Sequence, residues 1–199
     1  MLCDICQTAG VIATVEIAGT KYNLCEYDLI FADRMIHSRK HHCMLNIAWG
    51  AGRIGPQDWY GLRDFFRANN IKEVLEMGAG LSSELFVNEG LGLISFDVLK
   101  EHVVLLAGLD AMKNYATFHH YEYGTEPPVK ELYSGRKWDF VFVDGPQERS
   151  REVKVAMEVS SKYIFLHDPN FGEQSFFPNE EWIRVNNSDK LFEKVQKCF

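Results

Sequence analysis

The chain has 199 residues, 46% of them hydrophobic, and a formal net charge of −7 at pH 7. This length allows one sizeable hydrophobic core and one small additional module. The negative charge argues against a protein whose main task is to grip a phosphate backbone. No apolar run is long enough to span a membrane and no signal segment opens the sequence, so we expect a cytoplasmic protein without a membrane partner.

The first fifty residues predict a small zinc-binding module. Cys3 and Cys6 form a CxxC pair, an alternating hairpin pattern covers residues 11–24, and Cys25 stands where a helix begins. Thiolates on a knuckle and on the first turn of a helix can converge on a tetrahedral zinc ion. So small a module has little core of its own, and we expect a structural zinc ion to supply its stability.

The spacing leaves more than one candidate for the fourth zinc ligand. Asp28, three residues after Cys25, is the expected ligand, which gives the set Cys3, Cys6, Cys25 and Asp28. The competing candidates are His37, His41, His42 and Cys43. The five cysteines of the chain do not form a disulfide-like pattern, in keeping with a reducing compartment.

A domain boundary is expected near residues 50–55, a glycine-rich run that Pro56 closes. Residues 1–55 carry five acids and five bases, so the rest of the chain carries the whole net charge of −7. We therefore predict a zinc module with a linker helix over residues 1–50 and a second domain over residues 51–199.

The second domain alternates predicted helices and strands. A helix is expected over residues 56–70, and a short strand near 74–75 leads into a glycine turn at 78–80. A helix then opens at Ser82, and a second strand ends in Asp97. Glycines let the backbone approach a ligand closely, and an acid at the end of the next strand accepts hydrogen bonds from ribose hydroxyls. A dinucleotide turn has a third glycine where Ser83 stands.

The remaining elements complete an α/β pattern. We predict helices over residues 100–115 and 150–161, strands over 116–123, 138–143 and 163–166, and a C-terminal hairpin over 182–195. Apart from Asp139, the 138–143 strand is apolar, which is typical of a central parallel strand. His119 and His120 are adjacent in a strand and should face opposite sides of the sheet.

Glu76-Met77-Gly78-Ala79-Gly80 resembles the first motif of the class I S-adenosylmethionine-dependent methyltransferases, apolar-Glu/Asp-x-Gly-x-Gly. Asp144-Gly145-Pro146 and His167-Asp168-Pro169 after buried strands resemble the small-molecule O-methyltransferase-like branch of that family. The terminal hairpin is similar to the antiparallel pair that ends the family's sheet. The resemblance spans about residues 50–199 and implies a doubly wound, mostly parallel, seven-stranded α/β sheet, a Rossmann-like methyltransferase fold.

The resemblance also implies roles for individual residues. S-adenosylmethionine is expected to contact Glu76, Gly78, Ala79, Gly80, Ser82, Asp97, Val98, Glu122 and Asp144. An acid before the glycines suits a cofactor with a cationic amino-acid tail. The Gly-Asp pair common at the end of the family's third strand is replaced here by Glu122-Tyr123-Gly124.

The predicted catalytic residues are Asp144, His167 and Asp168, which follow neighbouring strands and can converge at one edge of the sheet. In one hypothesis His167 is a general base, since the pKa of histidine lies near neutral pH. In the other, Asp144 and Asp168 hold Mg²⁺ or another divalent cation that lowers the pKa of a substrate hydroxyl, as in the metal-dependent O-methyltransferases that the pattern resembles.

The predicted function is therefore O-methylation of a small hydroxylated substrate. One alternative is a nucleotide-dependent oxidoreductase of Rossmann type, against which Glu76, Ser83 and the terminal hairpin count. The other is a non-catalytic methyltransferase-like scaffold whose zinc module binds a protein or nucleic acid partner.

Overall fold

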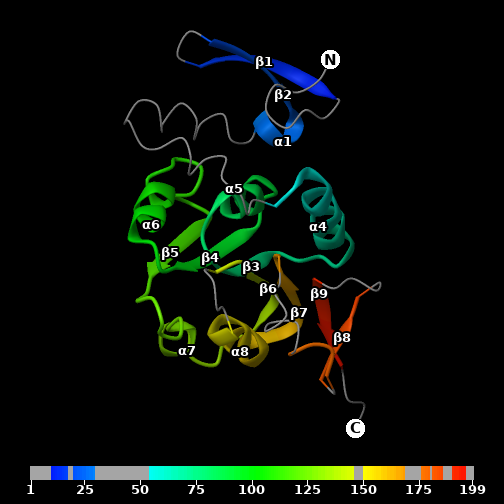
Figure 1. Ribbon diagram of the computed structural model, residues 1–199, viewed down its shortest axis with the longest axis vertical. Coiled ribbons are helices and arrows are strands. Elements are labelled where there is room, and N and C mark those ends of the chain that lie inside the picture. The colour runs from blue at the N-terminus through cyan, green and yellow to red at the C-terminus, as the bar shows by residue number, and fades with distance from the viewer. Residues whose placement is uncertain are drawn as a thin grey trace. The chain divides into compact units, whose positions relative to one another are not determined.

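The computed structural model describes residues 10–17, 20–29, 54–145, 150–168, 176–179, 181–185 and 190–195. The chain divides into two compact units, Met1–Gly61 and Leu62–Phe199 (Figure 1). The predicted boundary near residue 50 lies outside the described residues and stays a prediction.

In the first unit, the described residues form a hairpin and a short helix. Strand β1 (Val11–Ile17) pairs antiparallel with β2 (Thr20–Cys25), which confirms the predicted hairpin. Helix α1 (Glu26–Leu29) follows Cys25 at once. The fully buried Tyr27 donates its hydroxyl proton to the carbonyl of Ile54, so the first turn of this helix is tied to the chain that precedes α4.

The second unit is built on a seven-stranded sheet of order β5-β4-β3-β6-β7-β9-β8. The five strands from β5 to β7 pair in parallel, whereas β9 pairs antiparallel with both β7 and β8. This confirms the predicted mostly parallel sheet with a terminal antiparallel pair. The strands are β3 (Glu73–Met77), β4 (Gly92–Asp97), β5 (Ala116–His120), β6 (Trp138–Val143), β7 (Ser160–Leu166), β8 (Trp182–Arg184) and β9 (Leu191–Lys194).

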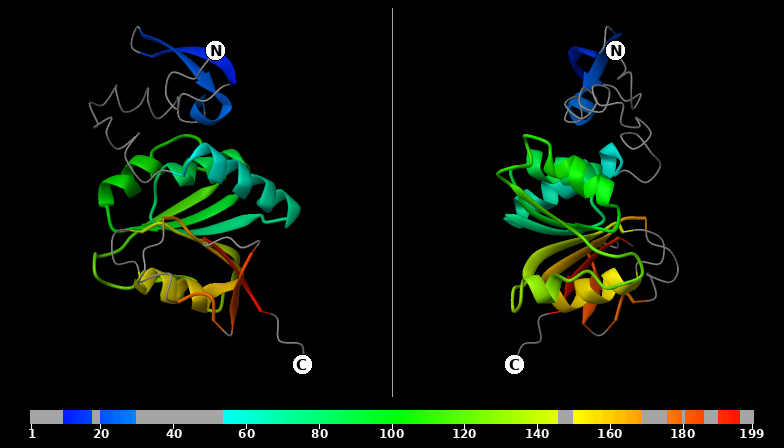
Figure 2. Two further views of the ribbon diagram at one scale, coloured as in Figure 1. Left: turned by 45° about the vertical axis from the view of Figure 1, so that its right-hand side comes forward. Right: turned by 90° about the vertical axis from the view of Figure 1, so that its left-hand side faces the viewer.

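Helices lie on both faces of this sheet, as in a doubly wound fold (Figures 1 and 2). Helices α5 and α6 cover one face together with the second half of α4, and α7 and α8 cover the other (Figure 2). Their bounds are α4 (Pro56–Ala68), α5 (Leu81–Asn88), α6 (Lys100–Ala107), α7 (Val129–Leu132) and α8 (Ser150–Val159).

The apolar run of β6 is explained by burial on both faces. Phe140 packs edge-on against Phe66 of α4, with ring centroids 4.8 Å apart. Val141 and Val143 point the other way, into a cluster that includes Val153 of α8. Because alternate side chains meet helices on opposite faces, the positions of β6 from Phe140 to Val143 are all apolar.

Several predicted elements are shorter in the structure. Helix α6 ends at Ala107 rather than at residue 115, because Gly108 ends it and turns follow. Strand β5 ends at His120 rather than at residue 123. Helix α8 ends at Val159, since Ser160 already pairs with β6. Helix α7 was not predicted, because four residues carry no periodic signal.

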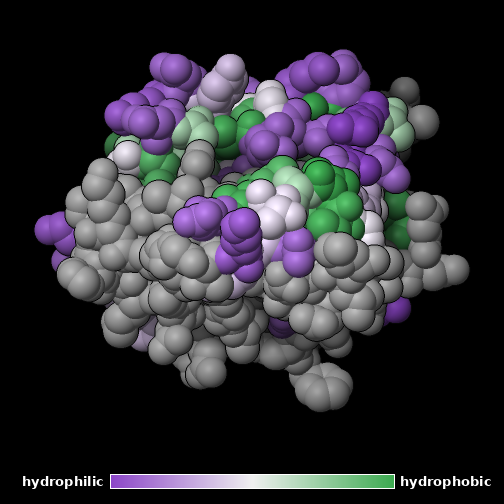
Figure 3. All heavy atoms as spheres, turned by 90° about the horizontal axis from the view of Figure 1, so that it is seen from above, coloured by the Kyte–Doolittle hydropathy of each residue, from purple (hydrophilic) through white to green (hydrophobic). Residues whose placement is uncertain are grey.

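The surface of the described part mixes polar and apolar side chains. Figure 3 shows a face on which hydrophobic side chains reach the surface among hydrophilic ones. The exposed large apolar side chains include Leu99 and Val104 of the α6 region and Tyr115 before β5. No helix in the described ranges is both long and apolar enough to cross a membrane.

Candidate functional site

The strand order places a ligand-binding position between β3 and β6. From β3 the chain winds outward through β4 and β5, and from β6 it winds through β7 in the opposite direction. Open α/β sheets bind ligands outside the carboxyl ends of the strands where this direction reverses. Gly78 follows β3 and Asp144 follows β6, so the two predicted site segments meet at this point.

The contact between these segments requires a glycine at position 78. Gly78 has a φ of +101°, and a Cβ atom there would lie 2.2 Å from the carbonyl oxygen of Asp144. The N–H of Gly78 donates to the carbonyl of Phe96 at 2.7 Å, and the N–H of Asp144 donates to the carbonyl of Met77 at 2.7 Å. The turn is therefore clamped between β4 and β6.

Gly80 stands in a different environment. Its backbone is extended, and a Cβ atom there would meet nothing within 4 Å. Its N–H donates to the hydroxyl of Ser83 at 3.1 Å. The loop thus borders open space at Gly80, which is the position where a ligand can approach the backbone.

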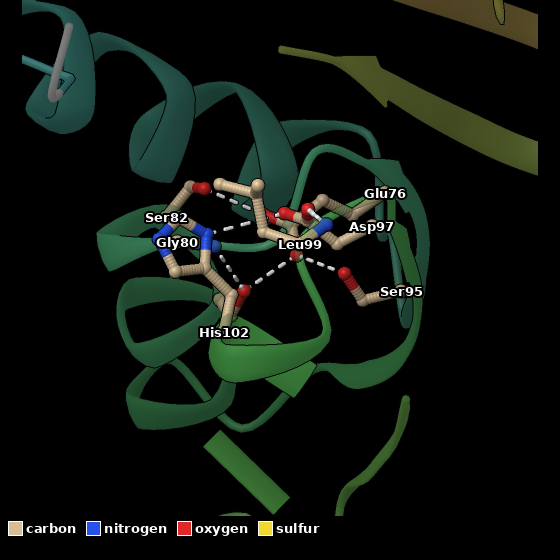
Figure 4. A network of polar contacts seen from close by, with 8 residues as sticks. Glu76, Gly80, Ser82, Ser95, Asp97, Leu99 and His102 are labelled. Carbon is tan, nitrogen blue, oxygen red and sulfur yellow. Dashed lines mark hydrogen bonds and ion pairs between the residues drawn. The ribbon is translucent and has the colours of Figure 1, made fainter. Parts of the chain in front are cut away.

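Glu76 lies beneath this loop and is completely buried (Figure 4). Its Oε1 accepts a hydrogen bond from Ser82 at 2.5 Å, and its Oε2 accepts from Ser83 at 2.5 Å and from Ser95 at 2.6 Å. Burial raises the pKa of Glu76 from 4.5 to about 7, although the three hydroxyls lower it. The nearby carboxylate of Asp144 raises that pKa further.

Asp97 occupies the end of β4, next to Ser95 and facing the same loop (Figure 4). Its Oδ1 accepts from the N–H of Leu99 at 2.5 Å, and its Oδ2 lies 3.4 Å from Nδ1 of His102 in α6. The buried carboxylate is thus held by the first residues after the strand.

Three predicted catalytic residues converge at the ends of β6 and β7. Nδ1 of His167 lies 3.0 Å from Oδ1 of Asp144, and Nε2 lies 3.7 Å from Oδ2 of Asp168. The His167 side chain is 2% exposed, against 24% for Asp144 and 60% for Asp168. Nζ of Lys190, just before β9, lies 3.5 Å from Oδ1 of Asp168.

His167 stands between the two carboxylates. Asp144 is within hydrogen-bond distance of its Nδ1, and Asp168 lies nearest its Nε2. Among the described side chains, no group of three or more histidines, cysteines, aspartates or glutamates has the arrangement of a metal site. The histidine hypothesis and the divalent-cation hypothesis for these residues both stay predictions.

The remaining predicted cofactor residues lie around the same edge. Ala79 is buried in the turn, Ser82 is buried in the first turn of α5, and Val98 is half-buried directly after Asp97. Glu122 is exposed in the turn after β5, where its carbonyl accepts the N–H of Thr125 at 3.1 Å. His119 stacks on Phe96 while His120 is exposed, which confirms that they face opposite sides.

Sequence reasoning missed several residues of the site. Ser95 is paired directly with Glu76 in the parallel register of β3 and β4, which a sequence does not display. Tyr121 donates to the buried Glu152 of α8 at 2.8 Å, and burial raises the pKa of this tyrosine above its usual range. For Glu152, the sequence offered only an acid in the first turn of the helix predicted over residues 150–161.

The predicted zinc ligands remain largely outside the described residues. Cys3 and Cys6 lie outside them, as do His37, His41, His42 and Cys43, and the Asp28 side chain is not described. Cys25 is buried at the end of β2, next to α1, and the zinc site stays a prediction.

A pocket of about 280 Å³ lies at the opposite edge of the sheet, where the strands begin. Glu73, Arg136 and Trp138 are among its lining residues. Nη2 of Arg136 lies 2.6 Å from Oε2 of Glu73, and its guanidinium lies 5.1 Å from the ring centroid of Trp138. Because ligands of this fold bind at the carboxyl edge, we assign no role in methyl transfer to this pocket.

No protein-family model and no curated protein matches the chain. Solved structures do match it. A methyltransferase from Geobacter sulfurreducens matches over 94% of this chain and 100% of its own, with a TM-score of 0.58 and 13% identity. A Staphylococcus aureus protein described as a caffeoyl-CoA O-methyltransferase matches over 85% of this chain and 92% of its own, with a TM-score of 0.60 and 11% identity.

An O-methyltransferase from Bacillus cereus, solved in complex with SAH, matches with a TM-score of 0.51 and 13% identity. The match covers 65% of this chain and 63% of that enzyme, so the chain spans less than two thirds of its length. Identities this low show the fold alone. The chain has the Rossmann-like methyltransferase fold, which confirms the predicted fold of the second domain.

Proposed function

We propose that the chain is an S-adenosylmethionine-dependent methyltransferase that acts on a hydroxyl group of a small molecule. The observation that carries this proposal is the convergence of two clusters at one edge of the sheet. The glycine turn with Asp97 forms one, and Asp144, His167 and Asp168 form the other. The fold shared with solved methyltransferases supports it.

The residues around the turn fit the cofactor. Gly80 borders open space, and Asp97 stands at the end of β4 with its carboxylate held in place. We assign the amino-acid tail to the loop from Gly78 to Ser82 and the ribose to Asp97, with Val98, Glu122 and Asp144 nearby. When bound, S-adenosylmethionine supplies a methyl group on a positively charged sulfur, which a nucleophile displaces in line.

His167 is the proposed base. As the substrate oxygen bonds to the methyl carbon and the carbon–sulfur bond breaks, the hydroxyl proton has to leave. Asp144 holds Nδ1 of His167 at 3.0 Å, so the opposite nitrogen faces Asp168. An imidazole oriented by a carboxylate at one nitrogen accepts a proton at the other, as in other carboxylate–histidine pairs.

Calorimetric titration of the purified chain with S-adenosylmethionine, and in parallel with NAD, tests the proposal. We expect micromolar binding of S-adenosylmethionine, weakened about 10- to 100-fold in Asp97→Ala, the range for a lost hydrogen bond to a charged group. Arg136→Ala, at the opposite edge, serves as a control with unchanged affinity. Binding of NAD without binding of S-adenosylmethionine would point to the oxidoreductase alternative. If neither ligand binds, the result would point to the non-catalytic scaffold alternative.

For the first unit we propose a structural zinc ion held by Cys3, Cys6, Cys25 and Asp28. The hairpin between the second and third cysteines and the burial of Cys25 at the start of α1 support it. Elemental analysis should find about one zinc ion per chain in the wild type and a reduced content in Cys25→Ser. We further propose that this module contacts a protein or nucleic acid partner. The test is a pull-down experiment that uses the purified full chain loaded with zinc.

A further inference from the structure

We propose that Glu76 is a positioning residue whose ionised carboxylate, through the hydroxyls of Ser82, Ser83 and Ser95, holds the loop after β3 in the shape that binds S-adenosylmethionine. The inference rests on the proposed function and deepens it. Sequence reasoning placed Glu76 in direct contact with the cofactor, whereas in the structure both of its oxygens are engaged by serine hydroxyls beneath the loop.

The direction of the hydrogen bonds matches the ionised form. An ionised carboxylate only accepts, and three serine hydroxyls donate to it. The three donors come from different places: Ser82 and Ser83 from the first turn of α5, and Ser95 from β4. The carboxylate therefore joins the loop to the neighbouring strand at a point with no exposure to water.

Protonation of Glu76 would change the loop itself. A carboxylic acid has to donate its proton, so one serine oxygen would become an acceptor and its hydroxyl would need another partner. Ser83 is already an acceptor, because the N–H of Gly80 donates to it at 3.1 Å. A reversed hydrogen bond at Ser83 would thus disturb Gly80, the residue that borders open space.

The charge of the cofactor links the ionisation of Glu76 to cofactor binding. S-adenosylmethionine carries a sulfonium and an ammonium group against one carboxylate, and a cation near a buried carboxylate favours its ionised form. Asp144 after β6 is the titratable group that acts on the pKa of Glu76, and Asp97 at the end of β4, with His102 of α6, lies at the same loop (Figure 4). Asp144 opposes ionisation of Glu76, and a bound cation offsets that repulsion.

Proton release on binding is the measurement. The wild type should release a fraction of a proton when it binds S-adenosylmethionine near pH 7, measured by calorimetry in two buffers that differ in ionisation enthalpy. Its affinity should rise by up to about tenfold between pH 6 and pH 8 relative to Glu76→Gln, which cannot ionise. S-adenosylhomocysteine, which lacks the sulfonium charge, should show a smaller rise.

Two further variants keep the test decisive. Glu73→Gln changes an exposed acid on the same strand and should keep the wild-type profile. Ser95→Ala removes the one donor that lies on β4 rather than on the loop, and should move the midpoint of the pH profile upward because that hydroxyl lowers the pKa of Glu76. This variant serves if Glu76→Gln does not fold.

The outcomes separate the two proposals. If the wild type binds S-adenosylmethionine but Glu76→Gln shows the same proton release, or Ser95→Ala leaves the midpoint in place, the positioning role is wrong and the proposed function stands. If the wild type does not bind S-adenosylmethionine at all, the proposed function is wrong and this inference is overturned with it.

Discussion

The two halves of the candidate site are built in opposite ways. At the end of β3, Glu76 is completely buried and turned inward onto three serines. At the ends of β6 and β7, a buried His167 stands between two carboxylates that reach the solvent, and Asp168 is 60% exposed. The carboxylate of the first half is shielded from water beneath a loop, whereas those of the second half are accessible to it. Acids at the ends of neighbouring strands therefore stand in different environments.

The largest expected effect comes from the two glycines of the turn. Gly78→Ala should destabilise the fold by about 3 kcal/mol, because a Cβ atom would lie 2.2 Å from the Asp144 carbonyl oxygen at a positive φ. Gly80→Ala should leave the free energy of unfolding within about 0.5 kcal/mol of the wild-type value, since a Cβ atom at this position meets nothing within 4 Å. Urea unfolding of both variants measures this, and equal losses would contradict the clamped turn.

Gly80→Ala should still weaken S-adenosylmethionine binding, because the added methyl group enters the open space beside the loop. Calorimetric titration of this folded variant separates ligand contact from stability. Gly78→Val, by contrast, would change stability and ligand binding together, so the two effects could not be separated.

The second comparison concerns catalysis. His167→Gln should lower kcat about 100-fold with little change in cofactor affinity, the usual contribution of a positioned general base. Asp168→Asn should have a smaller effect, because its carboxylate lies 3.7 Å from Nε2 of His167, beyond hydrogen-bond distance. Single-turnover assays with a hydroxylated substrate found by screening would measure both. A larger loss in Asp168→Asn than in His167→Gln would move the base role to the carboxylate.

The buried half predicts a pH effect on stability. Burial raises the pKa of Glu76 from 4.5 to about 7, so between these values the folded chain binds more protons than the unfolded chain. The free energy of unfolding should therefore fall as pH rises through this window, by about 2 kcal/mol between pH 5.5 and pH 8 from this group.

Other groups also titrate in that range, so the informative quantity is the difference between the wild type and Glu76→Gln. Unfolding in urea at both pH values provides it. A difference that is the same at pH 5.5 and pH 8 would show that Glu76 keeps an ordinary pKa.

The smallest effect is expected far from the site. Arg136→Ala should cost about 1 kcal/mol of stability, through the loss of a partly exposed ion pair with Glu73 and of contact with the Trp138 ring. Thermal unfolding measures the loss, and affinity for S-adenosylmethionine should not change. A change in affinity would mean that the edge where the strands begin communicates with the site.

The sequence by itself determined the α/β fold and which strand ends carry polar groups. The apolar run at 140–143 indicated a strand buried on both faces, and the glycines at 78 and 80 mark the turn that follows β3. These are local signals, since burial and backbone conformation depend on residue type and spacing. The same holds for Asp144 and His167, whose convergence follows from parallel neighbours.

Only the tertiary structure decided what the acids do. Ser95 reaches Glu76 because the register of β3 and β4 pairs these two residues across nineteen positions of sequence. Lys190 reaches Asp168 because β9 returns antiparallel beside β7. Gly78 and Gly80 look alike in the sequence, yet one is pressed against β6 and the other borders open space. Register and packing are properties of pairs distant in the chain, and no local pattern encodes them.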